Sequence, residues 1–261
     1  MAFRPRNWMR RMMRRRVQED WSRLGGNVPH MGAGQLRELR AEAGMMRQVM
    51  DRFLMRSDPR VIVSKADLAA LPLPGGTDWR WRPEFLSSPV SPAGIAAPAS
   101  GARLGEAAAL WHDCPEQSLI LRQIRNAGAT DLAAFGLRVE VMSFAGGFLS
   151  LSVDLPPEVL SGLTRNYILR LETAIEIERD LDIYARLNIA NGPNTEEMLR
   201  HLGGMRAGAV STNLTEFDLA LTEMNERRLD KIWLDLIFER PQMNAAVIRE
   251  MVLSRHPRAN I

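Results

Sequence analysis

The chain is poor in cysteine and has no long apolar run. It holds one cysteine, Cys114, among 261 residues, so no disulfide can form within it. No apolar stretch comes near the ~20 residues that a membrane-spanning helix requires. The N-terminus is charged without a following apolar segment, so a secretory signal is not expected. We predict a cytoplasmic protein, with association at the cytoplasmic face of a membrane left open.

Recognisable catalytic motifs are missing as well. There is no glycine-rich phosphate loop, paired-histidine metal motif or cysteine cluster. The "WHDC" stretch at 111–114 cannot form a triad by itself, because adjacent residues of an extended chain point to alternate faces. Cys114 is interpreted as a small buried residue. We therefore predict no metal site, no cofactor and no catalytic residue, and favour a non-catalytic protein while leaving hydrolysis open.

Positive charge is concentrated at one end. Residues 1–60 carry 14 Arg and 6 acidic residues, a net charge of +8, which leaves −5 for the other 201 residues. A basic end on a mildly acidic body is not the surface of a nucleic-acid-binding domain. Nucleic acid is thus the least favoured partner.

Residues 1–60 are predicted to form a basic segment of two helices. The first begins near Pro5, has Met13, Val17 and Trp21 at four-residue steps, and ends at Gly25-Gly26. It could lie on an anionic surface such as lipid headgroups, through residues 1–24, or contact another protein. The alternative is a helix that packs on its own protein and exposes its arginines. The arginines assigned to the anionic surface are Arg10, Arg11, Arg14, Arg15 and Arg16.

The second helix is predicted over residues 34–56, ending before Asp58-Pro59. Its apolar residues from Leu36 to Phe53 follow a coiled-coil rhythm for less than three heptads. An antiparallel pair with the first helix explains that rhythm equally well.

Residues 61–110 are predicted to form a Pro- and Gly-rich arm or linker. Residues 72–105 hold six prolines and five glycines, which is typical of irregular structure. Within them, "DWRWRPEFL" places Trp79 and Trp81 on one side of an extended segment, where they could stack on a sugar or a base. The favoured alternative is that the arm wraps the domain and inserts both Trp into its surface.

Residues 111–261 are predicted to form an antiparallel, jelly-roll-like β-sandwich, which makes the protein mainly β. Apolar and polar residues alternate in eight short segments without long helices between them. "SFAGGF" predicts a hairpin turn between residues 141 and 149. The alternation from Tyr167 to Ile189 is too long for one strand, so the chain must turn or change sheets near residues 178–180. The eight segments are 119–125, 137–143, 148–155, 167–177, 181–189, 217–221, 232–239 and 247–253.

Outward positions on two of these strands form the candidate ligand site. Tyr184, Arg186 and Asn188 alternate with apolar residues on one strand, and Trp233 and Asp235 do so on another. If the strands are neighbours, the side chains share a surface where an indole stacks on a sugar ring and polar groups bind its hydroxyls. The alternative is that the N-terminal helices or the arm cover this face.

The segment after the first of these strands is predicted to turn and become helical. Asn191-Gly192 and Pro193 are turn signals. Asn194 is a good N-cap with Glu197 three residues later, so a short helix would begin there and end at Gly203-Gly204.

Five stretches carry a resemblance: "DWRWRPEFL", "WHDCPEQSLILRQIRN", "FLSLSVDLPP", "YARLNIANGPNTE" and "WLDLIFERPQMN…SRHPRANI". Together they resemble an uncharacterised family of bacterial proteins of unknown function, over roughly residues 75–261. The resemblance implies no activity, cofactor or catalytic residue. More loosely, the strand rhythm is similar to that of jelly-roll carbohydrate-binding modules.

The sequence therefore favours non-catalytic binding or scaffolding, with the sandwich as a platform for a protein or glycan and the basic helix as a second contact. The alternative is a carbohydrate-binding or carbohydrate-active protein that acts on a surface polysaccharide. A third hypothesis is RNA binding through the N-terminal arginines.

Overall fold

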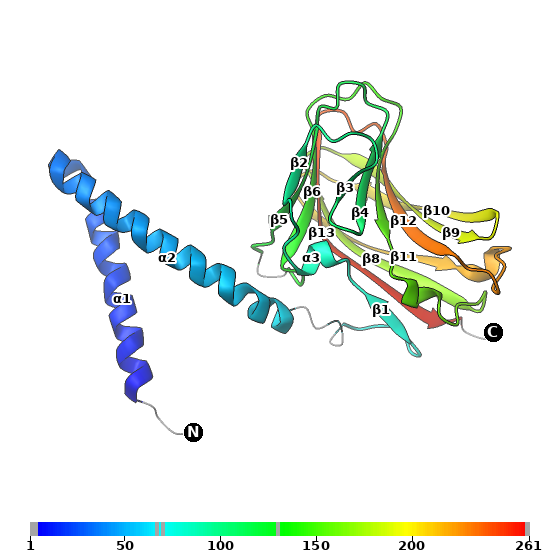
Figure 1. The fold of residues 1–261 in the computed structure, drawn as a ribbon, viewed down its shortest axis with the longest axis horizontal. Coiled ribbons are helices and arrows are strands. Elements are labelled where there is room, and N and C mark those ends of the chain that lie inside the picture. Colours follow the sequence, from blue (N-terminus) through cyan, green and yellow to red (C-terminus); the bar gives the residue numbers. More distant parts are fainter. Residues whose placement is uncertain (1–4, 66–67, 69–70, 129–130, 259–261) are drawn as a thin grey trace. The chain divides into compact units, whose positions relative to one another are not determined.

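The computed structural model describes residues 5–65, 68, 71–128 and 131–258. The chain divides into two compact units, Met1–Asp58 and Pro59–Ile261. Helices fill the first unit, and strands make up most of the second (Figure 1). No helix in the described part of the chain is both long and apolar enough to cross a bilayer.

The helices are α1 (Pro5–Gly26), the single turn η1 (Val28–His30) and α2 (Ala33–Lys65). The first agrees with the predicted helix. The second runs past Asp58-Pro59, where the sequence predicted its end. A proline removes one backbone donor from a helix, but it is a probable stop rather than an obligatory one.

The second unit is a sandwich of two antiparallel sheets. The first sheet has the order β11-β8-β13-β6-β5-β2, with β1 also paired to β13. Figure 1 shows β13 as the red arrow at the C-terminal end of the chain. Its strands are β1 (Trp79–Trp81), β2 (Gly94–Ala96), β5 (Leu119–Arg125), β6 (Phe135–Val141), β8 (Tyr167–Ile177), β11 (Val210–Asp218) and β13 (Asn244–Pro257).

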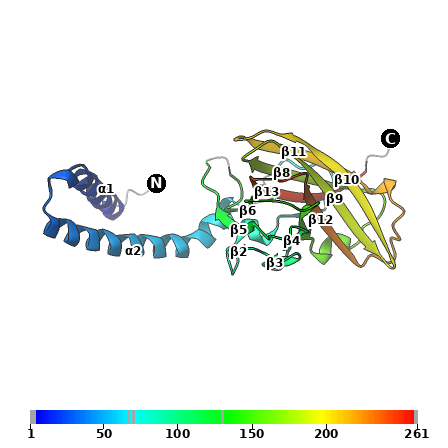
Figure 2. The same cartoon turned by 90° about the horizontal axis from the view of Figure 1, so that it is seen from above.

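The second sheet has the order β10-β9-β12-β7-β4-β3. Figure 2 shows β9, β10 and β12 side by side in yellow and orange. Its strands are β3 (Ala102–Leu104), β4 (Ala108–His112), β7 (Leu149–Asp154), β9 (Leu181–Asn191), β10 (Asn194–Met205) and β12 (Lys231–Phe238). Short helices α3 (Glu84–Ser87), η3 (Pro157–Leu160) and η4 (Leu219–Leu221) join the strands.

The core lies between the sheets and follows the period of two. Leu171 and Ile175 of β8 and Leu187 and Ile189 of β9 are all fully buried in it. The mainly β fold class and the antiparallel sandwich are therefore confirmed. The chain also leaves the first sheet after Ile177 and enters the second at Leu181, so it changes sheets where the sequence predicted a break.

Residues 79–110 of the predicted arm, 61–110, are not irregular, and with His112 as the last residue of β4 they belong to the sandwich. They supply β1 and β2 to the first sheet and β3 and β4 to the second. Three of these strands have only three residues, which is too short to show a period of two in the sequence. Their prolines lie outside the helices and strands, as Pro83 does at the N-cap of α3.

Two local predictions are wrong. The "SFAGGF" segment is not a hairpin turn, because β6 lies in the first sheet and β7 in the second. Residues 194–205 form strand β10 instead of a helix. Gly192 adopts a φ of 66° between paired residues Asn191 and Asn194, so the predicted turn exists, but it closes a hairpin. A two-residue turn directs the chain back along β9, and this pairing overrides the capping pattern.

Candidate functional site

The outer face of the second sheet brings five of the sequence-predicted site residues together. In the pairing of β9 with β12, Asn188 lies opposite Trp233 and Arg186 lies opposite Asp235. Tyr184 follows one step further along, opposite Ile237. The strands on which the prediction depended are thus direct neighbours.

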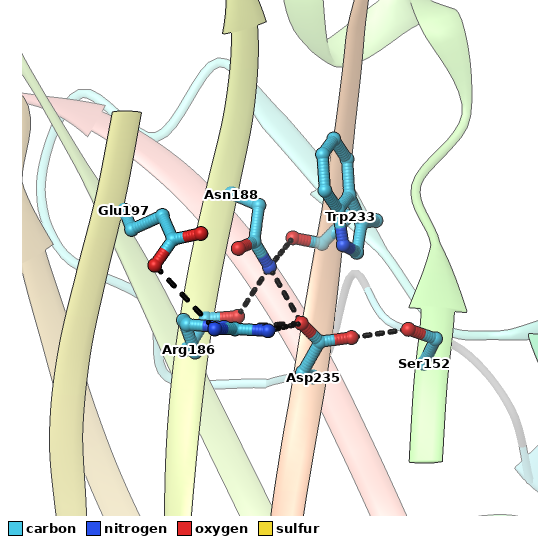
Figure 3. A network of polar contacts seen from close by, with 6 residues as sticks. All are labelled: Ser152, Arg186, Asn188, Glu197, Trp233 and Asp235. Carbon is cyan, nitrogen blue, oxygen red and sulfur yellow. Dashed lines mark hydrogen bonds and ion pairs between the residues drawn. The ribbon is translucent and has the colours of Figure 1, made fainter. Parts of the chain in front are cut away.

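Asp235 lies at the centre of a polar network on this face (Figure 3). Arg186 donates two hydrogen bonds from Nε and Nη2 to Asp235 Oδ2, at 3.2 and 3.0 Å. Asn188 Nδ2 donates to the same oxygen at 2.9 Å, and Ser152 Oγ of β7 donates to Oδ1. The carboxylate side chain is only 5% exposed. Both of its oxygens are therefore occupied by donors from the adjacent strands.

Arg186 extends this network to the edge of the sheet. Its Nη1 lies 3.4 Å from Glu197 Oε2 on β10, and its side chain is 36% exposed. Figure 3 shows the guanidinium between Glu197 and Asp235. A guanidinium held from both sides presents its remaining donors in a fixed orientation.

A second ion-pair cluster lies across β12. Asp154 of β7 is bound by Arg103 Nη2 and Lys231 Nζ, each at 2.8 Å. Burial acts to raise the pKa of Asp154, but the hydrogen bonds and charges of Lys231 and Arg103 outweigh it and lower that pKa. Lys231 also lies 5.5 Å from the centre of the Trp233 ring, a cation–π contact. Asp154 is therefore an ionised carboxylate at neutral pH.

These clusters form the floor of an open groove of about 620 Å³. That volume is in the range of small-molecule sites. Aromatic side chains line it together with the polar groups, and Trp111 and Phe148 are each 46% exposed. The lining residues are Arg103, Ala109, Trp111, Phe148, Ser150, Ser152, Asp154, Arg186, Lys231, Trp233, Asp235 and Ile237.

Phe148 is positioned by the "WHDC" segment. The Asp113 carboxylate accepts hydrogen bonds from the backbone N–H groups of Gly147 and Phe148, at 2.8 and 3.0 Å. These bonds lower the pKa of Asp113. His112 is buried, with Nε2 2.9 Å from the Pro98 carbonyl, and Cys114 is buried as predicted. Residues 111–114 thus anchor the backbone that leads into β7. Their side chains do not form a nucleophilic triad.

Trp79 and Trp81 are not part of this groove. They lie on β1 in the first sheet, stacked on each other with ring centres 6.5 Å apart, and pack against the core. The neighbouring Arg82 is buried and forms a bidentate ion pair with Glu250, with both distances 2.7 Å. This arrangement matches the favoured alternative, in which both Trp insert into the domain surface.

Tyr184 lies at one end of the outer face. Its ring is 4.8 Å from the ring of His201, and its hydroxyl donates to Glu239 Oε2 at 3.2 Å. The negative charge of Glu239 raises the pKa of Tyr184. Tyr184 therefore shares the face with Arg186 but does not line the groove itself.

The predicted anionic-surface residues lie on α1. Arg14, Arg15 and Arg16 are exposed, and Arg15 is 3.7 Å from Glu19. The side chains of Arg10 and Arg11 lie outside those that the structure describes. Met13 and Val17, beside these arginines, are 63% and 43% exposed. Within residues 12–47 no side chain is buried.

The sequence missed the half of the groove that β3, β4 and β7 provide. Trp111 was missed because β4 begins in the segment predicted as an arm and no strand was predicted there. Ser152 and Asp154 alternate with apolar residues on a predicted strand, so that alternation could have found them, but nothing in the sequence showed that β7 adjoins β12. Among the described residues no group of His, Cys, Asp or Glu could hold a metal ion.

Comparison with known proteins gives a family. The family model described as "Family of unknown function (DUF6478)" matches residues 1–261. This confirms the resemblance to a family of unknown function and extends it beyond residues 75–261. No curated protein matches the chain.

Several solved carbohydrate-binding modules are similar to the chain. The C-terminal family 22 module of Clostridium thermocellum Xyn10B is 10% identical, with a TM-score of 0.40 over 73% of this chain and 100% of that module. The CBM22-1 xylan-binding domain of Paenibacillus barcinonensis Xyn10C is 7% identical, with a TM-score of 0.39 over 64% of this chain and 94% of that domain.

The CBM22-1–GH10 modules of Clostridium thermocellum Xyn10B, complexed with xylohexaose, are 11% identical, with a TM-score of 0.39. This match covers 57% of the chain and only 29% of that protein. The likenesses agree with the looser similarity in strand rhythm. At these identities and TM-scores they do not identify a ligand.

Proposed function

The chain belongs to the DUF6478 family of unknown function, and we propose that it is a non-catalytic binding protein whose groove on the second sheet takes a carbohydrate. One observation carries this proposal: a buried polar network lies on the floor of an open groove that also presents aromatic rings. Sugars need both features, because their C–H faces stack on aromatic rings while their hydroxyls require oriented polar groups.

The carboxylates of the groove favour binding over catalysis. Asp235 accepts hydrogen bonds on both oxygens and its side chain is only 5% exposed, which favours a structural role over attack on a sugar. Asp154 is held ionised by Arg103 and Lys231 and so cannot donate the proton that glycoside hydrolysis requires. The side chains instead form a fixed surface for recognition.

A glycan array probed with the full chain tests the proposal. We expect binding of one class of glycan, and a loss of about tenfold or more in Trp233→Ala and Arg186→Ala, which remove a ring and a held guanidinium. Trp79→Ala is the matched control, because it removes an indole from the first sheet. Binding that is absent, or that survives both groove substitutions, would reject the carbohydrate site.

We further propose that α1 is a second contact, to a membrane surface with anionic lipids. Arg14, Arg15 and Arg16 are exposed on the same helix as the exposed apolar side chains Met13 and Val17. RNA phosphates would engage only the arginines, whereas a lipid surface accepts the apolar side chains as well. This contact would put the protein at the cytoplasmic face of a membrane, and the cytoplasmic localisation itself stays a prediction.

Co-sedimentation of the full chain with phosphatidylglycerol-containing vesicles tests this contact. Each arginine near an anionic bilayer contributes about 1 kcal/mol, so replacing Arg14, Arg15 and Arg16 with Gln should weaken binding by about two orders of magnitude. Neutral phosphatidylcholine vesicles are the control and should retain little protein. Retention on immobilised RNA without binding to vesicles would favour the RNA hypothesis instead.

A further inference from the structure

The backbones of Trp111 and Trp233 lie farther apart than the width of one sugar ring. Trp233 lies opposite Asp154 of β7, and Trp111 lies opposite Ser150 of the same strand. Four residues along a strand span about 13 Å, and β12 and β4 are two strand spacings apart, about 10 Å. The two Trp backbones are thus separated by about 16 Å on a diagonal across the sheet. We therefore expect a ligand that uses both rings to be a chain of several sugars.

Trp111 is held in place despite its exposure. It lies on the backbone of Gly101, where an added Cβ would come within 3.1 Å of the indole ring. Gly101 has a φ of 83°, and its N–H donates to the Leu110 carbonyl at 2.7 Å. The indole ring thus packs against Gly101 at the β3–β4 edge, where the lack of a side chain leaves room for it. An exposed indole that is held in one position is preorganised for stacking on a ligand.

The path between the two Trp passes over polar groups. The Asp235 network lies between the row of Trp233 and the row of Trp111. Ser150 Oγ, also in the lining, is buried and has no hydrogen-bond partner among the described residues. A hydroxyl can both donate and accept, which suits a sugar hydroxyl.

The charges of this face are balanced. Arg103 and Lys231 bind Asp154, and Arg186 binds both Asp235 and Glu197. Three cationic side chains therefore meet three carboxylates. A charged ligand would add an uncompensated charge to this balanced set, whereas an uncharged ligand leaves the balance unchanged.

We propose that the ligand is an uncharged, linear oligosaccharide that crosses the strands obliquely, with one ring on Trp233 and another on Trp111. This inference rests on the proposed carbohydrate-binding function and specifies its ligand class. Trp111 then determines how long a ligand must be to bind fully.

Calorimetric titration of the full chain with oligosaccharides of one to six units tests the inference. The neutral probes are linear gluco-, xylo-, manno- and galacto-oligosaccharides, and oligogalacturonides of matched length are the charged probes. We expect affinity for one neutral series to rise about tenfold or more between the shortest and longest members as the second stacking contact forms. Affinity should change less than about twofold between low and high salt, since no net charge is bound.

Trp111→Ala should remove that gain for long ligands and weaken the binding of short ligands that stack on Trp233 far less. Gly101→Ala displaces the ring without deleting it and should have the same effect, with thermal melting as a check that each variant is folded. If monosaccharides bind as tightly as hexasaccharides, or if oligogalacturonides bind more tightly and with strong salt dependence, the inference is wrong while carbohydrate binding stands. If no oligosaccharide binds the wild-type chain, the proposed function fails with it.

Discussion

At the scale of single residues, Asp235 holds the groove floor together and need not contact the ligand. The sequence identified it as a ligand-binding candidate because it is an outward acid beside a Trp. In the structure, three donors from β7 and β9 occupy its carboxylate. Its role is to orient Arg186 and Asn188, a positioning role that alternation alone could not distinguish from direct contact.

Removing Asp235 should therefore cost stability as well as binding. Asp235→Ala leaves a guanidinium, an amide and a hydroxyl without their acceptor, and we expect a loss of about 2–3 kcal/mol in the free energy of unfolding. Urea denaturation measures this loss. Glu197→Ala is the matched control, since its exposed pair with Arg186 at 3.4 Å should contribute less than about 1 kcal/mol. Equal losses in both variants would contradict the central role of Asp235.

The hydrogen bonds that the backbone N–H groups of Gly147 and Phe148 donate to Asp113 should be lost in acid. Its carboxylate accepts two backbone hydrogen bonds, which lower its pKa below the ordinary value of 3.8. Because this pKa is lower in the folded state than in the unfolded chain, the hydrogen bonds contribute fully to stability above pH 3.8. Their contribution is lost as the pH falls through the pKa of the folded state. We expect NMR titration to give a carboxyl pKa below 3.8. Asp113→Asn should speed amide exchange at Gly147 and Phe148 at neutral pH, and unchanged exchange would argue against the anchor.

At the scale of elements, β10 shows that one spacing of apolar residues is compatible with both a helix and a strand. Met198 and Leu202 are four residues apart, which suits one face of a helix and also one face of a strand. The capping signals favoured a helix, but the turn at Gly192 and pairing along β9 produce a strand. Gly203-Gly204, predicted to stop a helix, instead coincides with a shift in pairing register between His201 and Gly204.

The two glycines of this bulge should respond differently to substitution. Gly203 has a φ of 94°, a conformation that side chains disfavour, whereas Gly204 has an ordinary φ and open space around it. Gly203→Ala should destabilise the chain by about 1 kcal/mol or more, and Gly204→Ala should be neutral or slightly stabilising. Thermal or urea denaturation of both variants checks the difference. A larger loss for Gly204→Ala would mean that the bulge is not as described.

Element length decided which strands could be predicted. β8 and β9 are long, and their alternation placed the sheet change and the outward Tyr184, Arg186 and Asn188 correctly. β3 and β4 have three and five residues, so their alternation was hidden among prolines and glycines. The half of the site that the sequence found comes from the alternating strands β9 and β12. The half that it missed comes from the short strands β3 and β4 and from β7, a predicted strand whose neighbours were not predicted. Neighbour relations such as β7 beside β12 depend on sheet order, which local periodicity does not contain.

At the scale of the whole molecule, the two units differ in how they can be stable. Every buried core residue in the described chain lies in the unit Pro59–Ile261. The described side chains of α1 remain at least partly exposed. Since burial of apolar surface is the main favourable term in folding, the sandwich contains its own source of stability.

Deleting residues 1–58 should therefore leave the sandwich intact. We expect residues 59–261 to unfold cooperatively in urea, with a midpoint within error of the full chain's main transition, because no described core contact is removed. The same truncated chain should keep its glycan affinity and lose its binding to anionic vesicles. A midpoint that falls markedly would show that the helices stabilise the sandwich. Retained vesicle binding would instead move the membrane contact from α1 to the sandwich.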